Sequence, residues 1–241
     1  NMNVFISVNA IKFLDNAFHL SPKLKEDLRS SIRPNILLLV GSARSGKSSL
    51  GNVIIHRSFN PEIETFKTDE GNIPVTKEIQ YCKLMLSDLL RINGIDMNLS
   101  FDSEIFIFDC EGIDSLDKVT ELLRKAIMSL LQISTVNIFV SKNIDRSNIF
   151  SMKSFFLLPQ LIPGTQQKLN KNWAIVLTGI GVPGKPSKEN YEEKRKENDK
   201  NELNKFLGHL SDQNINFTKE NTAFFAQPKW KDKENYFESI L

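Results

Sequence analysis

The residues Gly41-Ser42-Ala43-Arg44-Ser45-Gly46-Lys47-Ser48 directly follow a short apolar run, NILLLV, at positions 35–40. They match the pattern G-x-x-x-x-G-K-[ST] at every fixed position. Glycines in this pattern permit a tight turn whose backbone N–H groups converge on phosphate oxygens, and the next helix adds the partial positive charge of its N-terminus. An unbroken apolar run of this length is typical of a buried parallel strand. The stretch therefore predicts a strand, a phosphate-binding loop and a helix, in that order.

The side chains of this loop have expected roles. Lys47 is placed to reach the β and γ phosphates of a nucleotide as a point charge, and the Ser48 hydroxyl is placed to ligate a Mg²⁺ ion on the same oxygens. Gly41 and Gly46 supply the turn. The other expected nucleotide contacts are Ser42, Ala43, Arg44, Ser45 and Ser49. The alternative, an ordinary turn with an exposed lysine, is disfavoured by the preceding strand and by the helical spacing of the apolar residues that follow.

A second acidic motif follows another apolar run. Residues 104–108 (EIFIF) lead into Asp109-Cys110-Glu111-Gly112. Ligands of doubly wound sheets lie outside the carboxyl ends of neighbouring strands, so Asp109 is expected to face the Mg²⁺ held by Ser48. The Gly112 N–H is expected to meet the γ-phosphate. The motif D-x-x-G alone is weak, but together with the phosphate loop it predicts one composite site.

The stretch Gly71-Asn72-Ile73-Pro74-Val75-Thr76 lies between these motifs and precedes an expected strand. Nucleotide switches place at this point the threonine that completes Mg²⁺ coordination. Thr76 is therefore a predicted metal ligand, with Ser48 and Asp109. The alternative is a β-branched residue that opens a strand.

Further apolar runs alternate with segments of helical spacing, which is typical of a parallel sheet. These runs are at 104–108, 135–140, 173–177 and 222–225, and the clearest helical stripe is at 117–132. Pro22 suits the first turn of an earlier helix. Residues 76–108 predict an antiparallel hairpin turning at Asn93-Gly94. The predicted fold is α/β of the P-loop NTPase type: a doubly wound, mostly parallel sheet with helices on both faces and an antiparallel edge strand. We expect one domain, residues 1–241, taken from a longer protein.

The composition excludes a disordered chain, a collagen-like structure and a disulfide scaffold. The 241 residues are 40% hydrophobic and 25% charged, the profile of a globular protein. A net charge of +2 gives no reason to expect nucleic acid or a membrane surface as partner. Cys82 and Cys110 are too few and too far apart for a disulfide framework, so a reducing cytoplasm fits best. The three histidines lie in unrelated segments and predict no metal cluster or triad. The charge-rich residues 185–205 predict a solvated helix or insertion.

Three segments together resemble one family. The arginine inside GSARSGKSS, the form DCEGID of the second motif and the pair in VTKEI are similar to the guanylate-binding protein and atlastin family of dynamin-like large GTPases. LLQISTVNIFVSKNIDRSNI and TAFFAQP resemble later parts of the same GTPase domain. The resemblance implies GTP hydrolysis, nucleotide-dependent dimerisation across the nucleotide faces and an internal arginine finger at Arg44. It also implies that Thr76 and Glu111 help to position the attacking water.

The chain departs from this family at two places. The family recognises guanine with an aspartate after the strand at 173–177, whereas here WAIVLTGIGVPG offers Thr178 and no carboxylate. The second departure concerns hydrolysis: Pro74, which has no donor, stands where the family has a serine that assists the reaction. Ile113 stands where small GTPases carry a water-orienting glutamine, as expected for the dynamin-like group. These departures predict slow turnover and leave the contact to guanine open.

Several alternatives therefore stay open. KSSLGNVI and VTKEIQ also resemble the AIG1-type GTPases, but Glu111 stands where that family usually has proline. By function, the domain is a GTPase that dimerises with nucleotide, a degenerate module that binds nucleotide with little hydrolysis, or an ATP-dependent enzyme. The last is the weakest, because no lid or substrate-binding arginines are evident.

Overall fold

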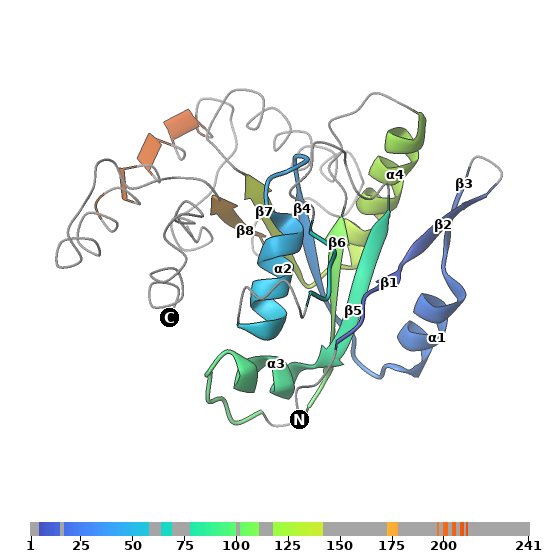
Figure 1. The fold of residues 1–241 in the computed structure, drawn as a ribbon, viewed down its shortest axis with the longest axis horizontal. Coiled ribbons are helices and arrows are strands. Elements are labelled where there is room, and N and C mark those ends of the chain that lie inside the picture. The colour runs from blue at the N-terminus through green and yellow to red at the C-terminus, as the bar shows by residue number, and fades with distance from the viewer. Residues whose placement is uncertain are drawn as a thin grey trace. The chain divides into compact units, whose positions relative to one another are not determined.

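The computed structural model describes residues 5–14, 17–57, 64–68, 78–99, 102–110, 118–141 and 173–177. It also describes eight helical residues further along the chain, at 197, 200, 201, 204, 205, 208, 209 and 211. They belong to two compact units, Asn1–Asn137 and Ile138–Leu241, which are described separately below. Strands and helices alternate along much of the chain (Figure 1). The fold is of the predicted mixed α/β class, with a mostly parallel central sheet, helices and an antiparallel edge.

Two parallel strands form the centre of the sheet in the first unit. β4 (Asn35–Gly41) pairs in parallel with β6 (Glu104–Cys110). In their register, Leu39 lies opposite Asp109, so the two strands end side by side. Both strands are almost wholly buried, as expected of apolar runs inside a doubly covered sheet. The phosphate loop and the acidic motif therefore begin at the same edge.

The antiparallel edge differs from the predicted hairpin. β5 (Ile79–Met85) runs antiparallel to β6, so the two predicted extended stretches pair as expected, but α3 (Leu86–Ile92) lies in the connection between them, where a tight turn was predicted. β1 (Val8–Asn9) pairs antiparallel with β5 on its outer side. The prediction of a hairpin turn at Asn93-Gly94 was wrong, because this dipeptide ends α3. Gly94 has φ of 68°, the left-handed conformation that commonly terminates helices.

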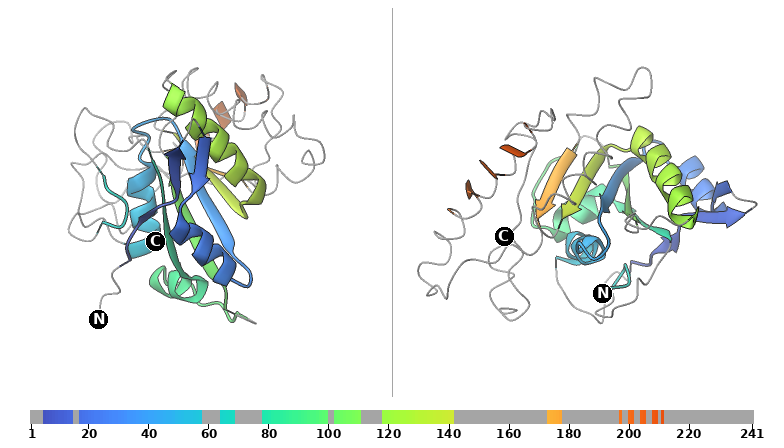
Figure 2. Two further views of the ribbon diagram at one scale, coloured as in Figure 1. Left: turned by 90° about the vertical axis from the view of Figure 1, so that its right-hand side faces the viewer. Right: turned by 90° about the horizontal axis from the view of Figure 1, so that it is seen from above.

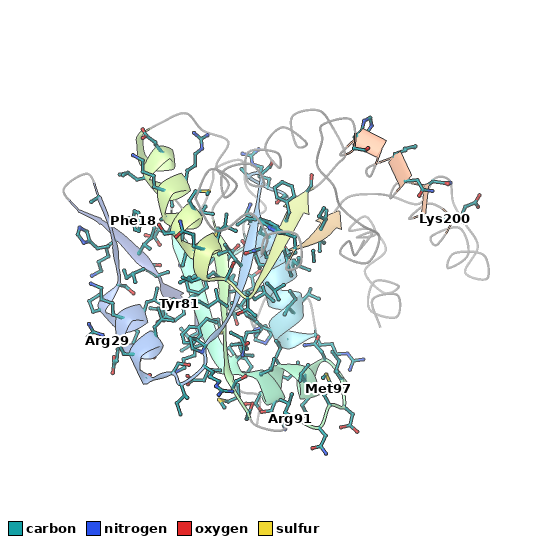
Figure 3. The ribbon with its side chains drawn as sticks, turned by 180° about the vertical axis from the view of Figure 1, so that it is seen from behind. Phe18, Arg29, Tyr81, Arg91, Met97 and Lys200 are labelled. Carbon is teal, nitrogen blue, oxygen red and sulfur yellow. The ribbon has the colours of Figure 1, made fainter. Side chains whose placement is uncertain are left out.

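Helices cover both faces of this sheet, as predicted (Figure 2). α2 (Lys47–His56) follows the phosphate loop and packs on the face that carries Leu39. α4 (Lys118–Ile133), close to its predicted bounds, covers the opposite face. α1 (Pro22–Ser30) begins at the predicted proline, and Tyr81 of β5 points toward it (Figure 3).

A short N-terminal hairpin was not predicted. β2 (Ile11–Leu14) pairs antiparallel with β3 (Ala17–Leu20) in a separate two-stranded sheet. β3 alternates between exposed and half-buried residues, and strands of four residues carry too little pattern to be recognised in the sequence.

In the second unit, two predicted strands are present. β7 (Val136–Ser141), which begins at the end of the first unit, and β8 (Trp173–Leu177) match the predicted runs closely. The described residues within 185–205 are helical and exposed, as expected of a solvated helix. The predicted strand at 222–225 lies outside the described residues. No described helix is long and apolar enough to cross a membrane.

Candidate phosphate-binding site

Glycines shape the loop between β4 and α2. Gly41 ends the strand with φ of 146°, and Gly46 has φ of 91° and ψ of 22°, a left-handed conformation. Residues with a side chain rarely adopt either backbone conformation, which explains why glycine stands at both of these fixed positions of the motif. Gly46 is also the N-cap of α2. No side chain of a glycine cap competes for the N–H groups of the first helical turn, which are the groups that bind anions at helix starts.

Arg44 lies at the tip of this loop. It is exposed and has φ of 58°, a positive value that is uncommon for a residue with a side chain. Such conformations cost about 1 to 3 kcal/mol and cluster at ligand-binding and catalytic turns. The strained backbone holds the guanidinium-bearing residue within the turn that the glycines form.

Lys47 is buried although it carries a charge. Its side chain is folded back over the loop, where Nζ donates a hydrogen bond to the Ser42 carbonyl oxygen at 2.5 Å. The backbone N–H of Ser45 donates to the same oxygen at 3.3 Å. A buried ammonium needs such a partner. The lysine is thus held inside the curve of the loop, a position that is compatible with the predicted contact to phosphate.

Ser48 and Asp109 join the loop to the acidic motif. Ser48 Oγ donates a hydrogen bond to Asp109 Oδ2 at 2.7 Å. The serine stands in the first turn of α2, and the aspartate near the carboxyl end of β6. The structure therefore brings together the phosphate loop and the acidic motif, as the sequence predicted.

The charges of Lys47 and Asp109 affect the pKa of a neighbouring thiol. Cys110, the last residue of β6, is fully buried, and burial raises the pKa of its thiol well above the ordinary value. The Asp109 carboxylate raises this pKa further, and the Lys47 ammonium lowers it. Cys82 is also buried and free, and burial raises the pKa of its thiol to about 12, so neither thiol is set up as a nucleophile.

The donor pair suits Mg²⁺. A serine hydroxyl and a carboxylate are hard oxygen ligands, and Mg²⁺ in phosphate-binding sites uses one or two protein oxygens together with phosphate oxygens and water. Ser48 and Asp109 would hold the ion, which would bridge and neutralise phosphate oxygens. Among the described residues, no group of three or more histidine, cysteine or acidic side chains is placed to hold another metal ion.

The structure also places residues that the sequence did not single out. Asn52 is buried on α2 and hydrogen-bonds to the backbone at Thr65 and Phe66. The packed face of α2 includes Gly51 and Ile55, whereas the apolar residues whose spacing predicted the helix are only half-buried. The sequence shows only an asparagine among the apolar residues of this helix, and no pattern in it identifies the backbone groups that Asn52 binds.

The remaining predicted site residues lie outside the described residues and stay predictions. They are Thr76, Glu111, Gly112 and Thr178. Of the other predicted contacts, Ser42 and Ser49 are half-buried and Ala43 is exposed. The site described here thus consists of the phosphate loop, the start of α2 and the end of β6.

The fold and this loop define a nucleotide-binding fold of the P-loop NTPase class. No protein-family model matches the chain, and no curated protein matches it in sequence. Among solved structures, the chain is similar to a dimerisation-deficient mutant of Toc33 from Arabidopsis thaliana. The two are 14% identical with a TM-score of 0.44, over 86% of this chain and 75% of that one.

Proposed function

We propose that this domain binds GTP with Mg²⁺ and hydrolyses it to GDP and inorganic phosphate. One observation carries the proposal: the Lys47 ammonium, the Ser48 hydroxyl and the Asp109 carboxylate are gathered around one glycine-bounded turn at the start of α2. These three groups are those that P-loop NTPases use to hold the β and γ phosphates and their metal ion.

The proposed reaction uses these residues mainly for positioning and charge stabilisation. A water molecule attacks the γ-phosphorus, the bond between that phosphorus and the β–γ bridging oxygen breaks, and the products are GDP and phosphate. Lys47 and the helix N-terminus hold the phosphates, and Ser48 and Asp109 would hold Mg²⁺, which would supply positive charge beside them. We assign to Arg44 the role of an arginine finger. Thr76 and Glu111 are proposed to orient the water, with the Thr76 backbone or hydroxyl completing the metal shell.

Guanine as the preferred base rests on the resemblance of GSARSGKSS, DCEGID and VTKEI to the guanylate-binding protein and atlastin GTPases. In place of the usual aspartate, the chain has Thr178 after β8. We propose that guanine is recognised there without a carboxylate, which predicts a narrower preference for GTP over ATP than a carboxylate contact gives.

The second candidate is a module that binds nucleotide with little or no hydrolysis. Ile113 in place of a water-orienting glutamine favours it. The two candidates share the phosphate site and differ only in the fate of the γ-phosphate. Nucleotide-dependent assembly is compatible with both.

A phosphate-release assay with GTP and with ATP, each with Mg²⁺, tests the proposal. The proposed GTPase releases phosphate slowly from GTP and more slowly from ATP, and Lys47→Ala abolishes release. Tight binding without release identifies the degenerate module. Equal release from ATP would contradict the choice of guanine.

We also propose that the domain forms a homodimer across its nucleotide face. The exposed position of Arg44 at the loop tip supports this, because the residue is accessible to a second copy. Such an interface between identical surfaces is isologous. Light scattering after chromatography, with GDP and with a non-hydrolysable GTP analogue, tests it: the analogue is expected to double the mass. An unchanged monomer mass in both states would contradict the proposal.

A further inference from the structure

A short segment, residues 64–68, is fastened to α2 by one asparagine side chain. Asn52 Oδ1 accepts hydrogen bonds from the backbone N–H groups of Thr65 at 3.0 Å and Phe66 at 2.8 Å. Asn52 Nδ2 donates to the Phe66 carbonyl oxygen at 2.7 Å. The asparagine is 4% exposed, so these bonds are shielded from water. One side chain thereby satisfies three backbone groups of a segment with no regular secondary structure.

The same segment is packed against α2 by an aromatic ring. Phe66 is fully buried. Its ring fills the space that the missing side chain of Gly51 leaves, because a Cβ built at Gly51 would lie 2.7 Å from Phe66 Cδ2 and 3.1 Å from Leu39 Cδ1. The close approach of helix and ring therefore requires glycine at this position.

A third contact lies one turn further along α2. The Thr65 hydroxyl is 2.7 Å from His56 Nε2 and donates to the Phe5 carbonyl oxygen at 3.0 Å. The Phe5 and His56 rings are also in contact, with centroids 5.9 Å apart. These contacts involve the Thr65 side chain, whereas the hydrogen bonds to the backbone of Thr65 and Phe66 come from Asn52.

Asn52 is also aligned with the phosphate site. It is four residues after Ser48 on the same helix, and residues four apart lie on one face. Residues 64–68 thus rest on the helical face that begins at the proposed metal ligand. In the sequence, the segment leads into residues 71–76, the predicted switch, which contains the predicted metal ligand Thr76.

We propose that Asn52 is a positioning residue that fixes the start of the switch segment to the helix carrying Lys47 and Ser48. This inference rests on the proposed function. The proposed function assigns a metal contact to Thr76, and Asn52 holds the chain that leads to Thr76 at residues 65 and 66 on α2. Asn52 therefore sets how strongly the site prefers a triphosphate to a diphosphate, without touching either.

Substitution of Asn52 separates this role from a purely structural one. Asn52→Leu has a similar size and removes all three hydrogen bonds. Asn52→Asp keeps acceptors for the two N–H groups and removes the donor to the Phe66 carbonyl, so a partial effect is expected. Asn93→Leu is the matched control: Asn93 Nδ2 also donates to α2, at the Ile54 carbonyl oxygen at 2.8 Å, and none of its hydrogen bonds reaches residues 64–68 among the described residues.

Two measurements are made on each variant of the full chain. In the nucleotide-free protein, hydrogen exchange of the Thr65 and Phe66 amides is expected to accelerate in Asn52→Leu and to stay unchanged in Asn93→Leu. Fluorescence titrations then compare labelled GDP with a labelled non-hydrolysable GTP analogue. Asn52→Leu is expected to weaken the analogue about tenfold relative to GDP, the scale of one to two lost hydrogen bonds. GDP affinity is expected to stay near that of the wild type.

The outcomes are distinct. An equal loss for GDP and analogue, or the same ratio in Asn52→Leu and wild type, overturns the inference and leaves the proposed function intact. Unchanged amide exchange in Asn52→Leu also overturns it. Wild-type protein that binds neither nucleotide overturns the proposed function and this inference with it. If Asn52→Leu fails to fold, the same ratio measured on Asn52→Asp decides the question.

Discussion

Ser48 and Asp109 are 61 residues apart in the chain, yet Ser48 Oγ donates a hydrogen bond to Asp109 Oδ2 at 2.7 Å. The contact follows from the parallel pairing of β4 and β6, which brings Leu39 opposite Asp109 and ends both strands at one edge. A hydroxyl and a carboxylate at this distance need little rearrangement to ligate one small cation. The two proposed metal ligands therefore lie within hydrogen-bond distance of each other.

Removal of the Ser48 hydroxyl should make nucleotide affinity nearly independent of Mg²⁺. Wild-type protein is expected to bind a labelled triphosphate analogue at least about tenfold more tightly with Mg²⁺ than with EDTA, since Ser48 and Asp109 would hold the ion and its charge would attract the phosphates. Ser48→Ala should lose most of this difference. Ser30→Ala, on α1, removes a hydroxyl remote from the loop and should keep it. An undiminished Mg²⁺ effect in Ser48→Ala would argue against the proposed metal site.

Arg44 should act on the rate of hydrolysis more than on binding. Arg44→Ala is expected to lower kcat for GTP by about 10³ to 10⁵, the range for an arginine finger, with a small change in nucleotide affinity. Arg57→Ala is a suitable control, because Arg57 is the other described residue with a side chain and positive φ. It should keep wild-type turnover. Equal rates for Arg44→Ala and wild type would exclude the finger role.

Gly51 should tolerate no side chain. Gly51→Ala gains about 1 kcal/mol of helix propensity but forces the buried Phe66 ring to move, at a typical cost of about 1 to 3 kcal/mol. We expect a net loss of about 1 kcal/mol in urea denaturation. Gly208→Ala makes the same change in a helix where a Cβ meets nothing within 4 Å, so it should stabilise or be neutral. A stabilised Gly51→Ala protein would show that the ring adapts without cost.

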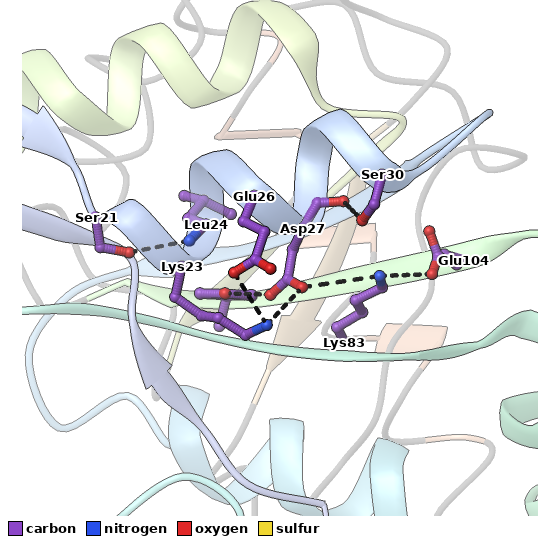
Figure 4. Close-up of polar contacts among 9 residues, drawn as sticks. Ser21, Lys23, Leu24, Glu26, Asp27, Ser30, Lys83 and Glu104 are labelled. Carbon is purple, nitrogen blue, oxygen red and sulfur yellow. Dashed lines mark hydrogen bonds and ion pairs between the residues drawn. The ribbon is translucent and has the colours of Figure 1, made fainter.

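A cluster of charges and one phenol joins α1 to the sheet (Figure 4). Tyr81 Oη donates to Asp27 Oδ2 at 2.6 Å, and Lys83 Nζ lies 2.6 Å from Glu104 Oε1 and 3.9 Å from Asp27 Oδ1. Burial raises the pKa of the Asp27 carboxyl, but hydrogen bonds from Tyr81 and Lys23 and the charges of Lys23 and Lys83 outweigh burial, so the pKa is lowered. The hydrogen bond from Lys83 is the largest cause that lowers the pKa of Glu104.

Stability should therefore fall in acid. A carboxyl with a lowered pKa contributes stability above its unfolded value of about 4, and this contribution is lost as the pH falls toward the folded pKa. At pH 7, Tyr81→Phe should lose about 2 kcal/mol in urea denaturation, the scale of a hydrogen bond to a charged group. At pH 3 the difference between variant and wild type should shrink. Lys23→Ala should cost little stability at either pH, because Lys23 is exposed and water screens its charge. A Tyr81→Phe deficit independent of pH would contradict the assignment.

The parts of the fold that the sequence predicted are those with one dominant pattern. β4, β6 and β8 contain short continuous apolar runs, whose length identifies them as strands, and α4 has a single apolar stripe at helical spacing. α3 was missed because it follows β5 without a break, and Met85 at its N-cap makes no side-chain capping bond. Without a capping residue to mark the start of a helix, the sequence of β5 and α3 resembles one extended stretch.

The candidate site divides in the same way. The phosphate loop and Asp109 could be predicted because their chemistry requires particular residue types at fixed spacing. The role of Asn52 could not, because its partners are 13 and 14 residues away in a segment with no periodic pattern. Only the tertiary structure reveals which backbone groups a buried polar side chain satisfies.

The most direct test of nucleotide binding at this loop is a fluorescence titration with labelled GDP and Mg²⁺ on wild type and Lys47→Ala, with unlabelled GTP, GDP and ATP as competitors. We predict that wild type binds, that GTP and GDP displace the label better than ATP, and that Lys47→Ala weakens binding about 100-fold, the scale of about 3 kcal/mol for a charged hydrogen bond. Lys25→Ala, an exposed lysine of α1, should bind like wild type. Equal binding by wild type and Lys47→Ala, or no binding by wild type, would contradict the assignment of this loop as a nucleotide site.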